Sequence, residues 1–431
     1  MLPSRSLGPR IVTLTIGEAL SVLLPTGEET ALLRACLHSG DSARDGWERW
    51  RAGRTAPPAE LCTALAQWRT LLPLLERSAV RNDLDVGRDV LPYLRATTLR
   101  EELRTVRYRK IVAGALTALE DAGITAFVVR GAALAATVYD AWPLRHCHDL
   151  DLLVDAEMLD TAVSALGRAG FRQAPGSPAL RTDAIAEHPS GLQIALHTRP
   201  FVIAYNDAVG DSFTRGSRHI TIEGVRTRAP SPEATLVHVL GHATYSSSRR
   251  NLRWVADAWH ILSRHRDLEW DDVLARIAVH RLDLPVSVLL GYLAEFGVAV
   301  PARALMLVRE RAACADPLAE DVALGGVTAA TQGDVVGIWR SMRSWRGRLR
   351  LVRWAVAPTR EYLRGAFSVP SDWLIPLCYL YRPARFVVGT LVRRAPPADA
   401  PRAPQAGARR RAVRRRLGQK ETPDSMGHRG A

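Results

Sequence analysis

Apolar residues recur at helical spacing through the first quarter of the chain. Between residues 16 and 105 they fall three or four positions apart, as at Leu61, Leu65 and Trp68, and this spacing lines one face of a helix. Helix-breaking residues interrupt the pattern at Pro25, Gly40, Pro57 and Pro58. Because such residues end helices, the pattern predicts short helices that form an N-terminal domain over residues 1–105.

A different pattern begins at residue 106, where helical stretches alternate with short runs of β-branched or aromatic residues. Helices are expected at residues 106–122, 132–139 and 156–169. Strands are expected at residues 127–129, 148–154, 192–198 and 219–228, the last divided by a turn at Glu223 and Gly224. The alternation predicts an α+β core with a small mixed sheet over residues 106–230.

Helical spacing returns after the start signal at Ser231, Pro232 and Glu233. It predicts a helical C-terminal domain over residues 231–392. Residues 393–431 consist mainly of Pro, Ala and Arg, a composition typical of a disordered tail.

Prolines and arginines interrupt the apolar stretch 373–392, whereas a membrane span needs roughly 20 largely uninterrupted apolar residues. No transmembrane helix is therefore expected.

Composition and charge describe an ordinary globular protein with a basic tail. The 431 residues are 47% hydrophobic and 24% charged, and the formal net charge is +14. Residues 401–431 hold nine Lys or Arg against Glu421 and Asp424, so half of the positive excess lies in the tail. The rest is spread over the folded body, so charge alone argues only weakly for binding to nucleic acid.

The cysteines indicate a reducing compartment. They are five in number, far apart in the sequence and never in a C-x-x-C pair: Cys36, Cys62, Cys147, Cys314 and Cys378. This spacing argues against a disulfide framework and against a cysteine zinc site. No cleavable signal peptide is recognisable near Met1. The expected location is the cytoplasm, with attachment to the periphery of a membrane through the basic C-terminal region as a further option.

The expected strand at residues 148–154 carries the chemistry. Side chains alternate between the two faces of a strand, so Asp149 and Asp151 point the same way. Two carboxylates held close together in a half-apolar setting favour a neutralising cation, and Mg²⁺ or Mn²⁺ suits oxygen ligands. Such ions assist phosphoryl and nucleotidyl transfer from a nucleoside triphosphate. The alternative is a chance D-x-D motif whose carboxylates are solvated.

The surroundings of this strand resemble a known family. Upstream stand Phe-Val-Val-Arg-Gly at 127–131, then Tyr139, Pro143 and Arg145, and then His-Asp-Leu-Asp-Leu-Leu-Val at 148–154. This ordered set resembles the uncharacterised nucleotidyltransferase family. In members of that family, a strand ends in Lys-Gly and the helix that follows ends in Tyr. An Arg and then the sequence Asp-Ile-Asp-Leu-Leu-Val come after it. The likeness covers roughly residues 15–390 in layout, and it is specific mainly between Phe127 and Val154.

The resemblance implies a polymerase-beta-like nucleotidyltransferase core in an α+β protein, flanked by helical N- and C-terminal regions. Asp149 and Asp151 match the family's metal-binding carboxylates. Arg130 takes the place of the usual Lys, and Gly131 and Arg145 match the family's Gly and Arg. These three residues would bind nucleotide phosphates at a helix N-terminus, and His148 would orient the strand or the nucleotide.

Besides Arg130 in place of Lys, a second position departs from the family pattern. The superfold usually carries a third carboxylate on a following strand, and Ala195 occupies the place where an acid is expected. His197, Asp183 or Glu187 could replace it, or the third ligand is absent. We therefore include His197 among the candidate catalytic residues beside Asp149 and Asp151. Without a third ligand, general-base activation of the acceptor is weakened.

Other motifs have a structural and a functional interpretation. His238 and His242 are spaced for zinc on one helix face, but they lack the Glu of H-E-x-x-H and fit core positions better. Asp257 is a buried salt-bridge partner or a helper in the site. The segment 340–354 alternates Arg with Trp, Leu and Val. It would bind an acidic membrane or RNA, or it is a solvated helix face.

Together these observations predict an enzyme that moves a nucleoside monophosphate from a nucleoside triphosphate to an acceptor hydroxyl or phosphate, with Mg²⁺ or Mn²⁺ and release of pyrophosphate. The acceptor would be a small molecule, a peptide or a protein, with nucleic acid ranked lower. The alternative is a catalytically weakened nucleotide-binding or interaction protein. Its basic tail would tether it to a membrane surface or polyanion.

Overall fold

The computed structural model describes residues 14–52, 58–88, 90–174, 184–201, 213–245, 252–331, 333–367, 369 and 371–382. Internal contacts divide the chain into two units, Met1–Cys378 and Tyr379–Ala431. The elements described below belong to the first unit. The predicted disordered tail at residues 393–431 lies outside the described residues.

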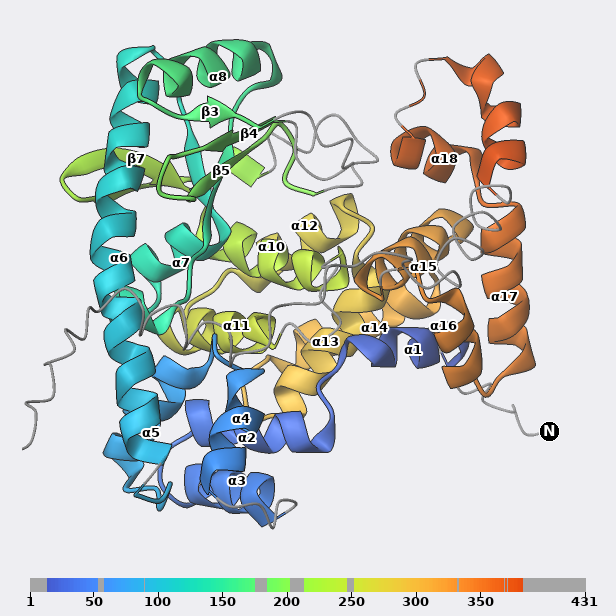
Figure 1. The fold of residues 1–431 in the computed structure, drawn as a ribbon. Helices are drawn as coiled ribbons and strands as arrows, with labels where there is room; N and C mark the ends of the chain where they lie inside the picture. The colour runs from blue at the N-terminus through green and yellow to red at the C-terminus, as the bar shows by residue number, and fades with distance from the viewer. Residues whose placement is uncertain are drawn as a thin grey trace, which may run out of the picture. The chain divides into compact units, whose positions relative to one another are not determined.

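A seven-stranded mixed sheet forms the centre of the α+β region (Figure 1). Its order is β3-β4-β5-β2-β1-β7-β6. The pairs β2·β5 and β1·β7 are parallel and the other neighbours are antiparallel. The strands are β1 (Phe127–Val129), β2 (Asp149–Leu153), β3 (Arg172–Gln173), β4 (Ala184–Glu187), β5 (Gln193–His197), β6 (Arg218–Ile222) and β7 (Val225–Ala229). The predicted fold class is confirmed.

Two helices cover one face of the sheet. Leu150 and Leu152 of β2 are fully buried there, in a hydrophobic cluster with residues of α6 (Val90–Asp121) and α8 (Leu159–Arg168). The short helix α7 (Arg130–Thr137) follows β1 directly and contributes alanines to the same cluster. Burial of these apolar side chains fixes which face of β2 turns toward the helices.

The other face of β2 packs toward α10 (Pro232–Tyr245). Phe127, Val129 and Leu153 form a small cluster on this face with Phe213 and with Ala234 of α10. Because Leu153 is two positions from Asp151, the Asp151 side chain turns to the same face. The candidate carboxylates therefore lie on the side of the sheet that α10 approaches.

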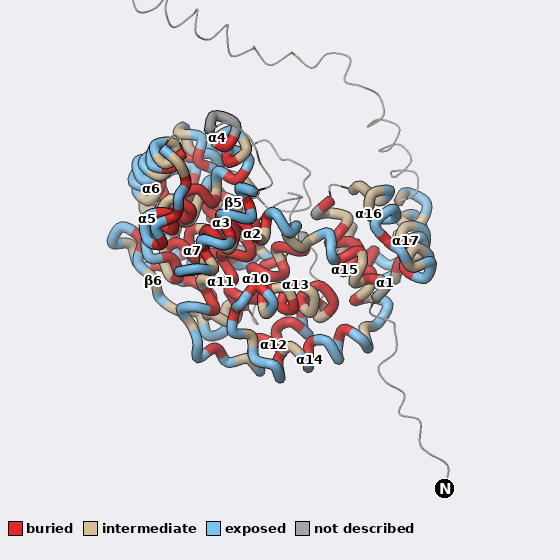
Figure 2. The backbone as a smooth tube through the Cα atoms, turned by 90° about the horizontal axis from the view of Figure 1, so that it is seen from below, coloured by how far each residue is buried: buried red, intermediate tan, exposed pale blue. Residues whose placement is uncertain are grey.

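N-terminal and later helices share one large core, whose residues are among the buried ones drawn in red in Figure 2. It joins apolar residues of 31–94 to apolar residues of 236–322. The N-terminal helices are α1 (Leu14–Leu20), α2 (Gly27–Leu37), α3 (Asp41–Ala52), α4 (Pro58–Ala66) and α5 (Leu72–Asn82). The later helices are α11 (Arg253–Arg264), α12 (Trp270–Val279), α13 (Asp283–Glu295), α14 (Ala302–Ala313) and α15 (Pro317–Ala330).

The long helix α6 differs from the sequence-based expectation. A helix was expected from residue 106, but α6 begins at Val90 and runs without a break to Asp121. Residues 90–105 contain one proline, Pro92, which is tolerated because it lies in the first turn of the helix. The helix thus continues through residue 105, where the predicted N-terminal domain ends. The four predicted domain ranges, 1–105, 106–230, 231–392 and 393–431, stay predictions.

The last described helices follow α15. They are α16 (Val335–Ser341), α17 (Trp345–Val356), α18 (Arg360–Phe367) and the 3₁₀ turn η4 (Asp372–Leu374). Asp334 caps α16 and Ser344 caps α17, each with its side chain accepting from a backbone N–H three residues on. In the part of the chain that the structure describes, every helix is too short or too polar to cross a bilayer.

Candidate functional site

Strand β2 presents the two aspartates at different depths. Asp151 is buried, whereas the Asp149 side chain is about one-third exposed. The Tyr108 hydroxyl donates to the Asp149 carbonyl at 2.7 Å, which ties the start of the strand to α6. One carboxylate is therefore open to solvent, and the other lies beneath the surface on the same face.

Asp151 accepts two close contacts on a single oxygen. The Arg130 guanidinium donates to Oδ1 at 2.6 Å, and Nε2 of His197 lies 2.8 Å from the same atom. Burial would raise the pKa of Asp151, but Arg130 and then His197 outweigh it and hold that pKa well below its usual range. Asp151 is thus a carboxylate at neutral pH, and the predicted residues Arg130, Asp151 and His197 lie together.

The junction between β1 and α7 brings Arg130 to this position. Arg130 has a φ of 55°, a left-handed conformation that is uncommon for a residue other than Gly. At the next residue, a Cβ on Gly131 would stand 3.2 Å from Cys147 Sγ and 3.6 Å from an Arg145 nitrogen. The segment that leads into β2 therefore packs directly against the start of α7, and glycine leaves room for it.

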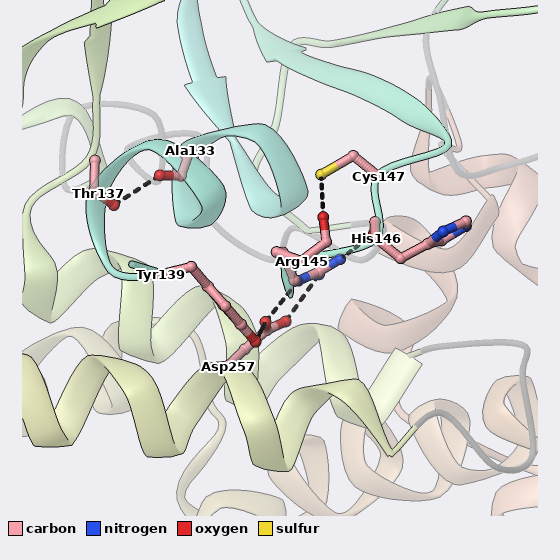
Figure 3. A network of polar contacts seen from close by, with 7 residues as sticks. All are labelled: Ala133, Thr137, Tyr139, Arg145, His146, Cys147 and Asp257. Atoms are coloured by element: carbon pink, nitrogen blue, oxygen red, sulfur yellow. Dashed lines mark hydrogen bonds and ion pairs between the residues drawn. The ribbon is translucent and has the colours of Figure 1, made fainter. Parts of the chain in front are cut away.

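Arg145 belongs to a buried network that Figure 3 shows in close-up. Its Nε donates to Oδ1 of Asp257 at 2.6 Å and its second terminal nitrogen donates to Oδ2 at 2.9 Å. The remaining nitrogen donates to the His146 carbonyl at 2.7 Å, and the Tyr139 hydroxyl donates to Asp257 Oδ1 at 2.7 Å. Of the two interpretations of Asp257, the structure supports the first: Asp257 is the partner of Arg145 in a buried salt bridge.

His148 stands at the exposed edge of the site. Its side chain is 57% exposed, and its Nε2 lies 3.4 Å from Asp149 Oδ2. Its ring stacks on His146, whose Nδ1 lies 2.9 Å from a Glu101 oxygen. Partial burial lowers the pKa of His148 although Asp149 favours its charged form. His148 thus neighbours the more open of the two carboxylates.

The helix α10 brings His238 and His242 toward Asp151. Burial, and next the positive charge of Arg130, hold the pKa of both histidines well below its usual value, so both rings are neutral. The His238 ring packs edge-on against Phe201 and Phe213, as a core residue would. Among the described residues, no group of three or more His, Cys, Asp or Glu side chains is arranged to hold a metal.

The position of a third carboxylate can be read from the strand register. Ala195 of β5 is the neighbour of Asp151, so alanine stands beside the buried aspartate. Glu187 of β4 pairs with Gln193, which pairs with Asp149, so Glu187 lies two strands away. Asp183 lies outside the described residues. Of the possible replacements that the structure describes, His197 is the one that contacts an aspartate of β2.

These residues fit a magnesium ion that is held by few side chains. Mg²⁺ is often bound through one or two carboxylates, and substrate phosphates and water supply the remaining ligands. Both contacts that Asp151 accepts from described residues end on Oδ1, and Asp149 is partly exposed. The arrangement matches this type of site better than one built from three protein ligands.

Arg253 at the start of α11 is a neighbour of the site that the sequence reasoning did not single out. Burial and then the nearby Arg145 lower its pKa, while Asp257 and Asp149 act in the opposite direction. A third guanidinium therefore accompanies Arg130 and Arg145. In the sequence it is one of 58 Lys and Arg residues. The signal that could have found it is the likeness of the segment 253–257 to the uncharacterised nucleotidyltransferase family.

Comparison with known proteins gives one family. The model of a family described as uncharacterised nucleotidyltransferase matches residues 56–297. Two solved structures are similar at 14% identity. The antibiotic-resistance factor ANT(2'')-Ia matches over 44% of this chain and 98% of that one, with a TM-score of 0.32. An antigenic nucleotidyltransferase-like protein from Paracoccidioides brasiliensis matches over 46% and 96%, with a TM-score of 0.31. No curated protein matches the sequence significantly.

Proposed function

Because the chain belongs to the family of uncharacterised nucleotidyltransferases, we propose that it transfers a nucleoside monophosphate from a nucleoside triphosphate to an acceptor, with release of pyrophosphate and with Mg²⁺ or Mn²⁺ as cofactor. One observation carries the proposal. The carboxylates of Asp149 and Asp151 share a face of β2 beside Arg130, at the point where β1 enters α7. Carboxylates of the kind that bind a metal ion thus lie beside a guanidinium of the kind that binds phosphate, and this juxtaposition supports the proposal.

The phosphate-binding side of the proposed site is formed by α7 and the arginines around it. Backbone amides at the start of a helix attract phosphate oxygens, and α7 begins at Arg130 and Gly131. An Arg145 nitrogen lies close to Gly131, and Arg253 lies near Arg145. We assign the triphosphate to this cluster, where the guanidinium groups of Arg130 and Arg253 would offset its charge. The nitrogens of Arg145 already donate to Asp257 and to the His146 carbonyl, so Arg145 would contact a phosphate by giving up one of these bonds.

The metal-binding side consists of Asp149 and Asp151. A bound Mg²⁺ or Mn²⁺ would neutralise charge on the triphosphate and favour departure of pyrophosphate. Asp151 is suited to this role because its lowered pKa keeps it ionised. His197 holds Asp151 in place from β5, and His148 stands beside Asp149 at the exposed edge, where it would orient the nucleotide.

The acceptor is proposed by class alone, as a hydroxyl or phosphate on a small molecule, a peptide or a protein. A nucleic-acid acceptor ranks lower because half of the positive excess lies at residues 401–431.

The cytoplasm, where nucleoside triphosphates are abundant, is the proposed location. It agrees with five cysteines that are all free thiols.

The test measures binding first and turnover second. Thermal-shift assays with ATP, GTP, CTP and UTP, with and without Mg²⁺, identify the nucleotide, and pyrophosphate release with candidate acceptors then reports turnover. The double variant Asp149→Asn, Asp151→Asn should lose the magnesium-dependent shift and the release of pyrophosphate. The matched control is Asp155→Asn with Asp160→Asn, two exposed aspartates of the segment that follows β2. Equal binding of nucleotide and metal by both double variants would refute the site.

A second candidate is a nucleotide-binding protein without appreciable catalysis. Two observations favour it: alanine stands beside Asp151 at position 195, and the Asp151 carboxylate is already paired with Arg130 and in hydrogen-bond contact with His197. This candidate predicts a nucleotide-dependent thermal shift with no pyrophosphate release for any acceptor. Pyrophosphate release that Asp149→Asn abolishes would exclude it.

A further inference from the structure

The helix α17 exposes an apolar stripe that no described part of the chain covers. The stripe, here called the α17 stripe, has side chains at spacings of four, three and four residues: Trp345, Leu349, Val352 and Val356. They are 65%, 56%, 43% and 56% exposed, respectively. At 100° per residue these positions fall within a narrow sector of the helix. The buried positions Gly347, Leu351 and Trp354 lie on the opposite side.

The helix is anchored to the protein through its other faces. Arg353 donates to Asp321 of α15 at 2.7 Å, and Arg350 is paired with Glu320. Leu351 is almost completely buried. Packing of α17 thus depends on the side opposite the stripe, and the stripe itself adds nothing to the core. Four exposed apolar side chains in one row need another explanation, because monomeric proteins scatter such residues.

Positive charge surrounds the α17 stripe. Residues 335–356 contain six arginines and no Asp, Glu or Lys. Four of the six have no ion-pair partner among the described residues: Arg340, Arg343, Arg346 and Arg348. Arg346 and Arg348 instead lie over the rings of Trp345 and Trp339, at 5.6 and 5.5 Å from the ring centres. The surface therefore combines apolar side chains with cations that remain available to a partner.

We propose that the α17 stripe docks on the surface of an anionic phospholipid bilayer. A helix with an apolar row flanked by arginines lies in the plane of the headgroups, where the row enters the acyl boundary and the guanidinium groups meet lipid phosphates. Trp is favoured at this depth. Single-stranded RNA would instead require a platform of accessible rings, and three of the four stripe residues are aliphatic. Charge complementarity and the aliphatic row together favour lipid.

Vesicle co-sedimentation of the full-length protein tests the proposal. The probe is a phosphatidylcholine vesicle with about a third phosphatidylserine, compared with phosphatidylcholine alone, since anionic headgroups attract clustered Arg. The variant Leu349→Ser, Val352→Ser should reduce partitioning by about tenfold or more, because two apolar side chains no longer enter the bilayer. The matched control is Leu99→Ser with Leu103→Ser, two exposed apolar residues of α6 (55% and 68%).

Two further measurements separate the stripe from other sources of binding. The basic residues between 401 and 431 would also attract anionic vesicles, but a contact through charge alone would survive both serine substitutions. Wild-type partitioning by the Leu349→Ser, Val352→Ser variant would therefore overturn the proposal. Arg346→Gln with Arg348→Gln should weaken partitioning about fivefold per arginine. Binding of wild-type protein to single-stranded RNA but not to the vesicles would also overturn it.

Discussion

Two buried pairs of Arg and Asp lie near each other. They differ in how many hydrogen bonds the carboxylate accepts and on which of its oxygens. Asp257 uses both carboxylate oxygens, receiving Arg145 on Oδ1 and Oδ2 and the Tyr139 hydroxyl on Oδ1. Asp151 receives Arg130 and His197 on Oδ1. The Arg145 side chain is 10% exposed and that of Arg130 is 20% exposed.

The difference indicates different roles. A bidentate Arg–carboxylate pair with a further hydrogen bond fixes the relative position of the elements that carry it, here α11 and the segment that leads into β2. The Arg130 contact to Asp151 involves one nitrogen and one oxygen, and Arg130 has strained backbone dihedrals. Asp257 and Arg145 form a structural clamp, whereas we propose that Asp151 and Arg130 exchange partners when a ligand binds.

The largest expected effect is a difference in unfolding free energy between variants of the two aspartates. Asp257→Asn removes the counter-ion of a buried arginine, so it should lower the free energy of unfolding by about 3–5 kcal/mol. Asp151→Asn should cost about 1–2 kcal/mol, because Arg130 can turn toward solvent. Urea denaturation of both variants measures the difference. Pyrophosphate release should show the reverse order at a temperature where both are folded, and equal stability losses would contradict the distinction between the pairs.

Arg130 should matter more for nucleotide binding than for folding. If Arg130 releases Asp151 to contact a phosphate, Arg130→Met loses a charge-assisted hydrogen bond worth about 2 kcal/mol. The dissociation constant of the triphosphate should therefore rise roughly thirtyfold, as measured by calorimetry. Arg172→Met on β3, an exposed arginine away from the site, is the matched control. An unchanged dissociation constant would show that Arg130 stays with Asp151 when nucleotide binds.

Local features of the site could be predicted from the sequence. Asp149 and Asp151 share a face because strand alternation is a property of the backbone, and the turn at Glu223 and Gly224 lies between β6 and β7 as expected. The family resemblance singled out Arg130 as a nucleotide-binding residue, and in the structure its guanidinium contacts Asp151; its binding of nucleotide stays a prediction. The shared strand face and the turn could be predicted because each depends on residues that are close together in the sequence.

Features that depend on distant contacts were missed. The strand β4 reads Ala-Ile-Ala-Glu, which lacks a β-branched or aromatic run, and its strand conformation comes from pairing with β3 and β5. The pairing of Arg145 with Asp257 joins residues 112 positions apart. Local periodicity carries no information about such a contact, so the structural clamp could be recognised only in the folded chain.

Acidic pH should lower the unfolding free energy through His260, a partly buried histidine that packs on Tyr139 beside the structural clamp. The His260 ring packs on Tyr139 with ring centres 4.1 Å apart, and burial lowers its pKa to about 4. Because the unfolded-state pKa is near 6.5, the stability that His260 contributes is complete above that pH and is lost as the pH falls toward 4. His260→Phe should reduce the loss of unfolding free energy between pH 7 and 5 by about 1–2 kcal/mol. Identical pH profiles for variant and wild type would contradict this.

The smallest expected effect tests whether the structural clamp also serves the nucleotide. Tyr139→Phe removes one hydrogen bond to Asp257, which keeps both contacts from Arg145, so the unfolding free energy should fall by about 1 kcal/mol. Tyr93→Phe on α6, whose hydroxyl makes no hydrogen bond with a described residue, should change it by less. Pyrophosphate release should stay within about twofold of wild type, since Arg145 keeps its place near Gly131. A larger loss of turnover than of stability would mean that the clamp sets the position of Arg145 for phosphate binding, and the two Arg–Asp pairs would then act as one site.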